Sequence, residues 1–204
     1  YMSLVPLIQP PVIKALTTKK ERMIRMPYKP EKISKRVKLV FPIIVTIIAG
    51  LIAPQSVELI GFLMFGNFLR ESLVVDRLSQ SAQNELVNIT TILLGLAVGS
   101  TMVGKDFINV GTLGIIALGL VAFIFDTAGG IWFVQIMNLF TKNKTNPMVG
   151  AAGISAFPMS ARVMQKMAQK VDPSNFILMH AIGANVAGQI GSVIAGGLIL
   201  ALIK

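Results

Sequence analysis

The stretch Asn146–Arg162, NPMVGAAGISAFPMSAR, decides how the rest of this chain is interpreted. It lies in a strongly apolar sequence, yet it contains two prolines, two glycines and several polar side chains. Pro147 and Pro158 each remove a backbone donor and disfavour helix in the residue before them. A segment interrupted in this way does not form a plain membrane helix. At membrane depth, irregular backbone survives only where protein or a water-filled cavity satisfies its polar groups, so we expect residues 146–162 to form a site.

The composition is that of an integral membrane protein. The chain has 204 residues, of which 53% are hydrophobic and 14% charged, and its mean hydropathy is +0.71. A soluble domain carries about 25% charged residues. The chain has no cysteine, which excludes disulfides, thiolate metal sites and cysteine nucleophiles. Its one histidine, His180, cannot alone form a zinc site or a serine-type triad.

Positive charge is concentrated in one part of the sequence. The chain has 19 Lys and Arg against 9 Asp and Glu, and ten of these cations fall between Lys14 and Lys38. We interpret residues 17–38 as a basic cytoplasmic loop, because the positive-inside rule places such charge on the cytoplasmic side of a membrane. A docking surface for a soluble partner is the alternative. Anionic lipid headgroups or an acidic partner subunit are better candidate neighbours than a nucleic acid.

Several apolar segments are too short to cross a bilayer as they stand. Residues 39–53 would cover roughly 22 Å as a helix, less than the hydrocarbon core of roughly 30 Å. Residues 57–69 are shorter still, and residues 70–85 are amphipathic and expected at the membrane interface. Residues 1–16 resemble the end of a membrane helix with breaks at Pro6, Pro10 and Pro11. Short segments interrupted by glycine or proline are typical of transporter folds with discontinuous helices.

Longer apolar segments follow, at residues 86–103, 107–140 and 175–203. The second either forms one long tilted helix or bends at residues 129–130. The last is expected to be interrupted near its middle, at residues 183–185. We therefore predict an all-α, polytopic membrane protein with discontinuous helices and a single transmembrane domain over residues 1–204.

Neutral oxygen donors gather in and near the interrupted stretch. Asn146, Ser155 and Asn185, together with backbone carbonyls freed by the breaks, are the ligand type that suits a hard cation. Arg162 has a planar fork that suits a carboxylate. These residues predict a cation site beside an anion site; the alternative is that the polar side chains only bond to neighbouring helices. Asp126 has the same two interpretations, as a functional carboxylate within the membrane or a supporting one.

Three blocks of sequence resemble one known family. They are NPMVGAAGISAFPMSARV, GNFLRESLVVDRLSQSAQNELVNITTILLGLAVGS and DPSNFILMHAIGANVAGQIGS. They are similar to the β subunit of the sodium-pumping, biotin-dependent decarboxylases, which act on oxaloacetate, methylmalonyl-CoA or glutaconyl-CoA. The likeness runs over essentially the whole chain, including the opening YMSLVPLIQPP, and corresponds to roughly the C-terminal half of such a subunit. The resemblance implies half of an inverted-repeat, transporter-like fold, and we expect further sequence before Tyr1.

The resemblance also implies an activity and its partners. Such a membrane subunit decarboxylates carboxybiotin, consumes a proton and exports sodium ions. The biotin is carried on a partner rather than attached to this chain. The implied partners are a biotin carrier domain or subunit, a carboxyltransferase α subunit, a small membrane γ or δ subunit, the lipid bilayer and further copies of the chain. The implied location is the bacterial or archaeal cell (inner) membrane, crossed several times.

The resemblance assigns roles to particular residues. Catalytic roles fall to Arg162, Ser155 and Tyr1, and Arg162 also holds the carboxylated cofactor. The sodium ligands are expected at Asn146, Gly150, Ser155 and Asn185. An intramembrane aspartate of the family's sodium site belongs to the other half of the subunit, so the resemblance implies that activity needs the complete subunit.

Two other functions remain open from the residues. A sodium-coupled secondary transporter of a carboxylate would use the same broken helices and polar groups without chemistry. An inactive fragment of the decarboxylase subunit is the third interpretation. Biotin dependence separates the first two, since a transporter is indifferent to avidin.

Overall fold

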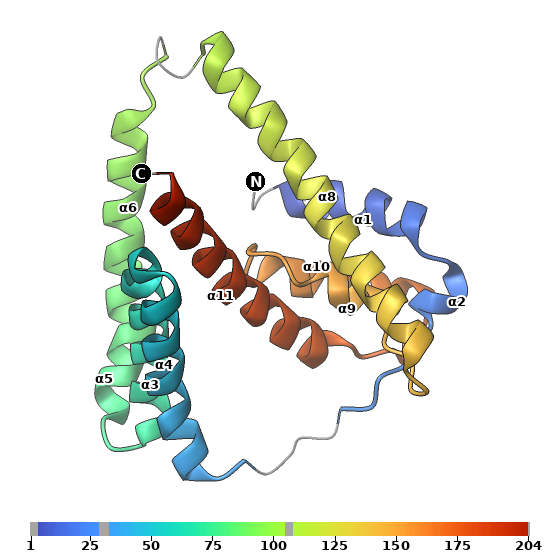
Figure 1. Ribbon diagram of the computed structural model, residues 1–204, viewed down its shortest axis with the longest axis horizontal. Helices are drawn as coiled ribbons and strands as arrows, with labels where there is room; N and C mark the ends of the chain where they lie inside the picture. The colour runs from blue at the N-terminus through green and yellow to red at the C-terminus, as the bar shows by residue number, and fades with distance from the viewer. Residues whose placement is uncertain (1–3, 29–32, 105–107, 204) are drawn as a thin grey trace. The chain divides into compact units, whose positions relative to one another are not determined.

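The computed structural model describes residues 4–28, 33–104 and 108–203, and within these ranges the regular structure is helical, with no strand. The chain divides into two compact units. The first unit comprises residues 1–30 and 116–192, and the second comprises residues 31–115 and 193–204. Figure 1 shows the helices of each unit along the chain. The interrupted stretch belongs to the first unit.

The second unit is organised around a helical hairpin. Helix α3 (Lys35–Ile52) is joined to α4 (Val57–Ser72) by a 3₁₀ turn, η2 (Pro54–Ser56), and the two helices lie side by side (Figure 1). The Ser34 hydroxyl caps α3 by accepting from the Val37 backbone N–H. Next come α5 (Asp76–Ser81), a π-helical turn η3 (Ala82–Leu86) and α6 (Val87–Thr101).

Two helices are long and apolar enough to cross a membrane by length and composition. They are α8 (Val110–Phe140) and α11 (Leu178–Leu202). Most of their side chains are not covered by protein, since 6% of the most apolar window of α8 and 11% of that of α11 are buried. Exposed apolar helices of this length are what a lipid environment accommodates. The structure therefore fits a helical membrane protein.

The first unit assembles short helices from both ends of the chain. It contains α1 (Val5–Leu16), α2 (Lys19–Arg22), α9 (Pro147–Ala151) and α10 (Met159–Val171), with parts of α8 and α11 (Figure 1). Helix α10 is strongly amphipathic and buries seven residues on one face. They pack in a core whose largest fully buried side chains include Ile13, Ile131, Met148, Met164 and Ile177. This core fixes the ends of the interrupted stretch.

The predicted breaks in α1 and α11 are wrong. Helix α1 continues through Pro10 and Pro11, although each proline removes one intrahelical hydrogen bond. It is held by tertiary packing instead, because Val5, Gln9 and Ile13, at a spacing of four residues, are fully buried.

Helix α11 runs without interruption through residues 183–185. An asparagine side chain disturbs a helix when it competes for nearby backbone groups. The side chain of Asn185 bonds to the Ile154 carbonyl instead, so the helix continues. Helix α8 is likewise one continuous helix of 31 residues across residues 129–130. Helix α3 begins at Lys35, so the last four residues of the basic segment 17–38 are helical.

Candidate functional site

The stretch from Asn146 to Arg162 forms two helices with irregular backbone between them. Asn146 caps α9, and its Oδ1 accepts from the Met148 backbone N–H at 3.0 Å. Pro147 follows at the first helical position, where a missing N–H costs nothing. Helix α9 ends after five residues, and α10 begins at Met159 after the cis peptide bond between Phe157 and Pro158.

Glycines bring the irregular backbone into direct contact with two long helices. A Cβ atom on Gly150 would lie 2.1 Å from the carbonyl oxygen of Gly130 in α8. A Cβ atom on Gly188 of α11 would lie 2.0 Å from the carbonyl oxygen of Gly153. Real Cβ atoms do not approach this closely, so glycine is required at these contacts. The structure thus gives Gly150 a packing role that the sequence prediction of a sodium ligand did not include.

The carbonyl that ends α9 has side-chain partners. Gln9 of α1 is fully buried, and its Nε2 donates to the Ala151 carbonyl at 3.0 Å. The Ser160 hydroxyl donates to Gln9 Oε1 at 3.0 Å and lies 3.4 Å from the same carbonyl. Sequence reasoning missed Gln9 and Ser160. The signal was present in Gln9, a strongly polar side chain inside the apolar run VPLIQPP.

Asn185 of α11 reaches the irregular backbone. Its side chain is fully buried, and its Nδ2 donates to the Ile154 carbonyl at 2.5 Å. This bond fixes the orientation of the amide, since the opposite orientation would set two acceptor oxygens against each other. Oδ1 is then a buried acceptor for which the described residues supply no donor. Ser155, the next residue after Ile154, is exposed.

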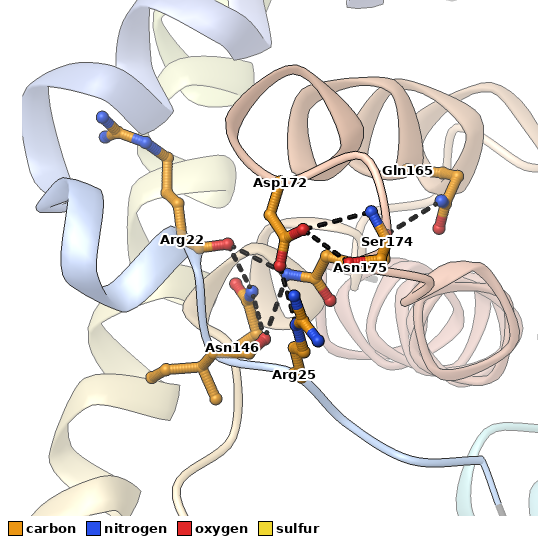
Figure 2. Close-up of polar contacts among 8 residues, drawn as sticks. Arg22, Arg25, Asn146, Gln165, Asp172, Ser174 and Asn175 are labelled. Atoms are coloured by element: carbon orange, nitrogen blue, oxygen red, sulfur yellow. Dashed lines mark hydrogen bonds and ion pairs between the residues drawn. The ribbon is translucent and has the colours of Figure 1, made fainter.

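Asn146 and Asn175 hold the end of α2 and the segment that follows it. The Nδ2 atoms of both side chains donate to the carbonyls of Arg22 and Ile24, at 3.0–3.3 Å (Figure 2). Asn175 is positioned by Gln165, whose Nε2 donates to the Asn175 carbonyl at 3.2 Å. Its own Oδ1 is buried and receives no donor from the described residues. Asn146 therefore has an evident structural function, and its partners differ from those of Asn185.

Two carboxylates, Glu21 in α2 and Asp172 at the end of α10, have lowered pKa values. Hydrogen bonds from the Arg25 and Ser174 side chains lower the pKa of Asp172, and the Arg25 Nε atom lies 2.7 Å from Asp172 Oδ2 (Figure 2). For Glu21, burial acts to raise the pKa, but hydrogen bonds from Thr18 and Gln135 outweigh it and the pKa is lowered. Both carboxylates are thus held in the charged form.

The predicted site residues are only partly brought together. Asn185 meets the backbone next to Ser155, while Asn146 lies at the other end of the stretch, on the carbonyls of Arg22 and Ile24. Arg162 is exposed on the first turn of α10, and neither ion pair found among the described residues involves it. Tyr1 lies outside the described residues. Within the same ranges, no three His, Asp or Glu side chains are grouped to hold a metal ion.

These observations fit a helical membrane protein, and an interrupted stretch in it meets two long apolar helices. The family described as the Na⁺-transporting oxaloacetate decarboxylase beta subunit matches residues 1–203, and the chain belongs to this family.

Named relatives come from three kinds of decarboxylase. The oxaloacetate decarboxylase beta chain of Klebsiella pneumoniae is 52% identical over 98% of this chain and 46% of its own length. The methylmalonyl-CoA decarboxylase subunit beta of Veillonella parvula is 52% identical over 100% of this chain and 54% of its own. The glutaconyl-CoA decarboxylase subunit beta of Acidaminococcus fermentans is 51% identical, again over 100% of this chain and 54% of its own. The chain therefore spans about half the length of these relatives.

Proposed function

We propose that this chain is part of a membrane subunit that decarboxylates carboxybiotin and couples the reaction to sodium export. Membership of the family and relatives at about half identity support the class of activity. One structural observation supports the sodium site: Asn185 Oδ1 is a buried oxygen beside irregular backbone, and the described residues supply no donor to it. A buried acceptor of this kind is costly unless something satisfies it, and a cation does so.

Sodium, as the transported ion, would be bound by neutral oxygens. Asn185 Oδ1 supplies one ligand, and Ser155 Oγ lies on the residue that follows the carbonyl to which Asn185 bonds. Gly150 O and Asn146 Oδ1 each already accept a backbone N–H, from Gly153 and Met148. Each of these oxygens keeps a second lone pair for a cation. Asn185 and Ser155 are thus the stronger pair in this proposal, and Gly150 and Asn146 the weaker one.

Arg162 would hold the carboxylate of carboxybiotin. Its guanidinium is exposed and free to present two parallel donors to a carboxylate. Cleavage of the nitrogen–carboxyl bond releases carbon dioxide and leaves the electron pair on the ureido nitrogen, which then takes up a proton. We assign delivery of that proton to Tyr1, with Ser155 at the junction of the sodium and carboxylate sites. The biotin itself stays on the partner that carries it.

The finer architecture and the assembly belong to the same proposal. The complete subunit would be an inverted repeat in the bacterial or archaeal inner membrane, with this chain as its C-terminal half. Residues 17–38 would face the cytoplasm, where the biotin carrier and the carboxyltransferase α subunit deliver the substrate. A small γ or δ subunit and further copies of the chain would complete the complex.

Carboxybiotin decarboxylation in membranes carrying the complete subunit tests the proposal. We expect turnover stimulated by sodium and abolished by Ser155→Ala. The matched control is Ser100→Ala on α6, where the hydroxyl bonds only to a carbonyl of its own helix. A turnover rate that is the same with and without sodium, and the same in Ser155→Ala, would contradict the sodium site. Sodium uptake without decarboxylation, insensitive to avidin, would replace the proposal with a sodium-coupled carboxylate transporter.

A further inference from the structure

A groove of about 400 Å³ lies between α1, α2 and α10 in the first unit. Its wall combines apolar and cationic side chains from segments that are far apart in the sequence. The apolar part is formed by Pro6, Pro10, Val163, Met167 and Val171. The cationic part is formed by Lys14, Arg22, Lys166 and Lys170. None of these residues has a place in the decarboxylation chemistry proposed above.

The lysines of the groove have no ion-pair partner among the described residues. The two ion pairs found among the described residues are Arg25–Asp172 and Lys38–Glu71, and neither includes a lysine of the groove. Lys166 and Lys170 stand four residues apart on α10, so they project from the same face. Two like charges at this spacing repel each other unless an anion lies between them. The arrangement therefore favours a negatively charged occupant.

Arg22 is held in place at the edge of the groove. Its Nη1 donates to the carbonyl and the hydroxyl of Thr17. Glu21, the residue before Arg22, accepts hydrogen bonds from Thr18 and Gln135, and the positive charge of Arg22 also helps to lower its pKa. Glu21 offsets at most the charge of Arg22, so the groove keeps the positive charge of its three lysines. Lys14 is in the last turn of α1.

We propose that this groove binds an anionic phospholipid, with the phosphate at the lysines and an acyl chain along the apolar wall. The acidic side chains of a soluble peptide would pair with the cations but would not contact the apolar surface of proline, valine and methionine. A phospholipid uses both parts. Basic pockets between membrane helices on the cytoplasmic side bind lipid headgroups, and the surrounding segment is rich in Lys and Arg.

The test measures lipid binding directly and needs no turnover. The protein, purified with the subunits that accompany it and stripped of lipid in detergent, is titrated with phosphatidylglycerol, and bound lipid is counted by native mass spectrometry. We expect Lys166→Gln with Lys170→Gln to weaken binding about 30-fold, since each lysine near a lipid headgroup contributes about fivefold. The matched control, Lys142→Gln with Lys144→Gln, removes the same charge from exposed positions outside the groove and should bind like the parent.

A charge-preserving variant and inorganic phosphate complete the test. Lys166→Arg with Lys170→Arg should retain the lipid, which separates loss of charge from loss of fold. Inorganic phosphate should not displace the lipid, because it has no acyl chain. Equal affinity of the Gln variant and its control would overturn the proposal, as would displacement by phosphate. Retention of lipid together with loss of a copurifying soluble subunit would show that the groove is a protein-docking surface instead.

Discussion

The two units of this chain are stabilised in different ways. In the first unit, buried polar side chains join segments more than a hundred residues apart: Gln9 to Ala151, Asn146 to Arg22 and Asn175 to Ile24. In the second unit, the side-chain hydrogen bonds of α6 go to carbonyls of the same continuous helix, and none of its residues is buried. The first unit is specified by its own contacts, whereas α6 presents apolar surface that lipid or other protein must cover.

This difference shows where chemistry can be placed in a membrane protein. Irregular backbone needs partners for its polar groups, and the first unit supplies them with amides and glycine contacts. In a continuous helix such as α6 the backbone groups are paired within the helix, so they need no other partners and none is left for a ligand. Substitutions in the first unit should therefore cost far more than matched substitutions in the second.

The largest effect is expected where glycines allow backbones to touch. Gly150→Ala and Gly188→Ala each place a methyl group about 2 Å from a carbonyl oxygen, so a helix must move. We expect a loss of about 3 kcal/mol in unfolding free energy, the upper end for overpacking. Gly95→Ala and Gly99→Ala on α6 meet nothing within 4 Å and should change stability by less than about 1 kcal/mol. Thermal unfolding in detergent measures all four, and equal costs would contradict the comparison.

Removing the buried amide of α1 should have the next largest effect. Gln9→Ala leaves a cavity and takes a donor from the Ala151 carbonyl, at a cost of about 2–3 kcal/mol. Asn84→Ala is the matched control, because that amide is exposed and bonds to a carbonyl one turn earlier. It should cost less than about 0.5 kcal/mol. Chemical denaturation of both variants measures the two losses in unfolding free energy. A Gln9→Ala variant as stable as the parent would contradict the role of this amide.

The two asparagines on the Arg22 and Ile24 carbonyls should differ from each other. Asn146→Ala loses both of these bonds and the cap of α9, at a cost of about 2 kcal/mol. Asn175→Ala loses two longer bonds but also removes an oxygen that has no donor among the described residues, so about 1 kcal/mol is expected. Comparing the unfolding midpoints measures the difference. A larger cost for Asn175 would show that its Oδ1 has a partner in the complete protein.

The smallest effect concerns the exposed ion pair between Arg25 and Asp172. Because the pKa of Asp172 is lowered in the folded state, its contribution to stability is present above the ordinary value of 3.8 and is lost as the pH falls through the lowered value. Arg25→Gln removes the largest cause of the shift, so stability should fall less steeply with pH below about 4. Thermal midpoints of parent and variant across that range check this, and identical slopes would contradict it.

The sequence predicted a helical membrane protein and its family, but not which polar groups are paired. Hydropathy and proline placement are local features, and they locate apolar helices and the stretch from Asn146 to Arg162. They failed at Pro10 and Pro11, because packing of a buried face outweighed the lost hydrogen bonds. They also failed at Asn185, whose side chain bonds to a residue 31 positions away rather than to its own helix. Contacts over such separations are set by tertiary structure.

For the candidate site, the sequence identified some of the residues that make specific contacts in the structure. The resemblance to the family picked out Asn146, Gly150 and Asn185, and the structure shows specific contacts for each of them. Gln9 and Asn175 were missed because neither belongs to a motif, and only the fold brings them to irregular backbone. The sodium-binding roles of Asn146, Gly150, Ser155 and Asn185 stay predictions, as do the catalytic roles of Arg162, Ser155 and Tyr1.

The most direct test of the central claim compares two asparagines that each bury an oxygen without a donor among the described residues, Asn185 and Asn175. The measurement is the shift in thermal midpoint of the complete subunit when sodium chloride replaces potassium chloride at constant ionic strength. A ligand bound only by the folded state raises this midpoint. The account predicts that parent and Asn175→Ala are stabilised by sodium and that Asn185→Ala is not. A sodium shift that survives Asn185→Ala unchanged would contradict it.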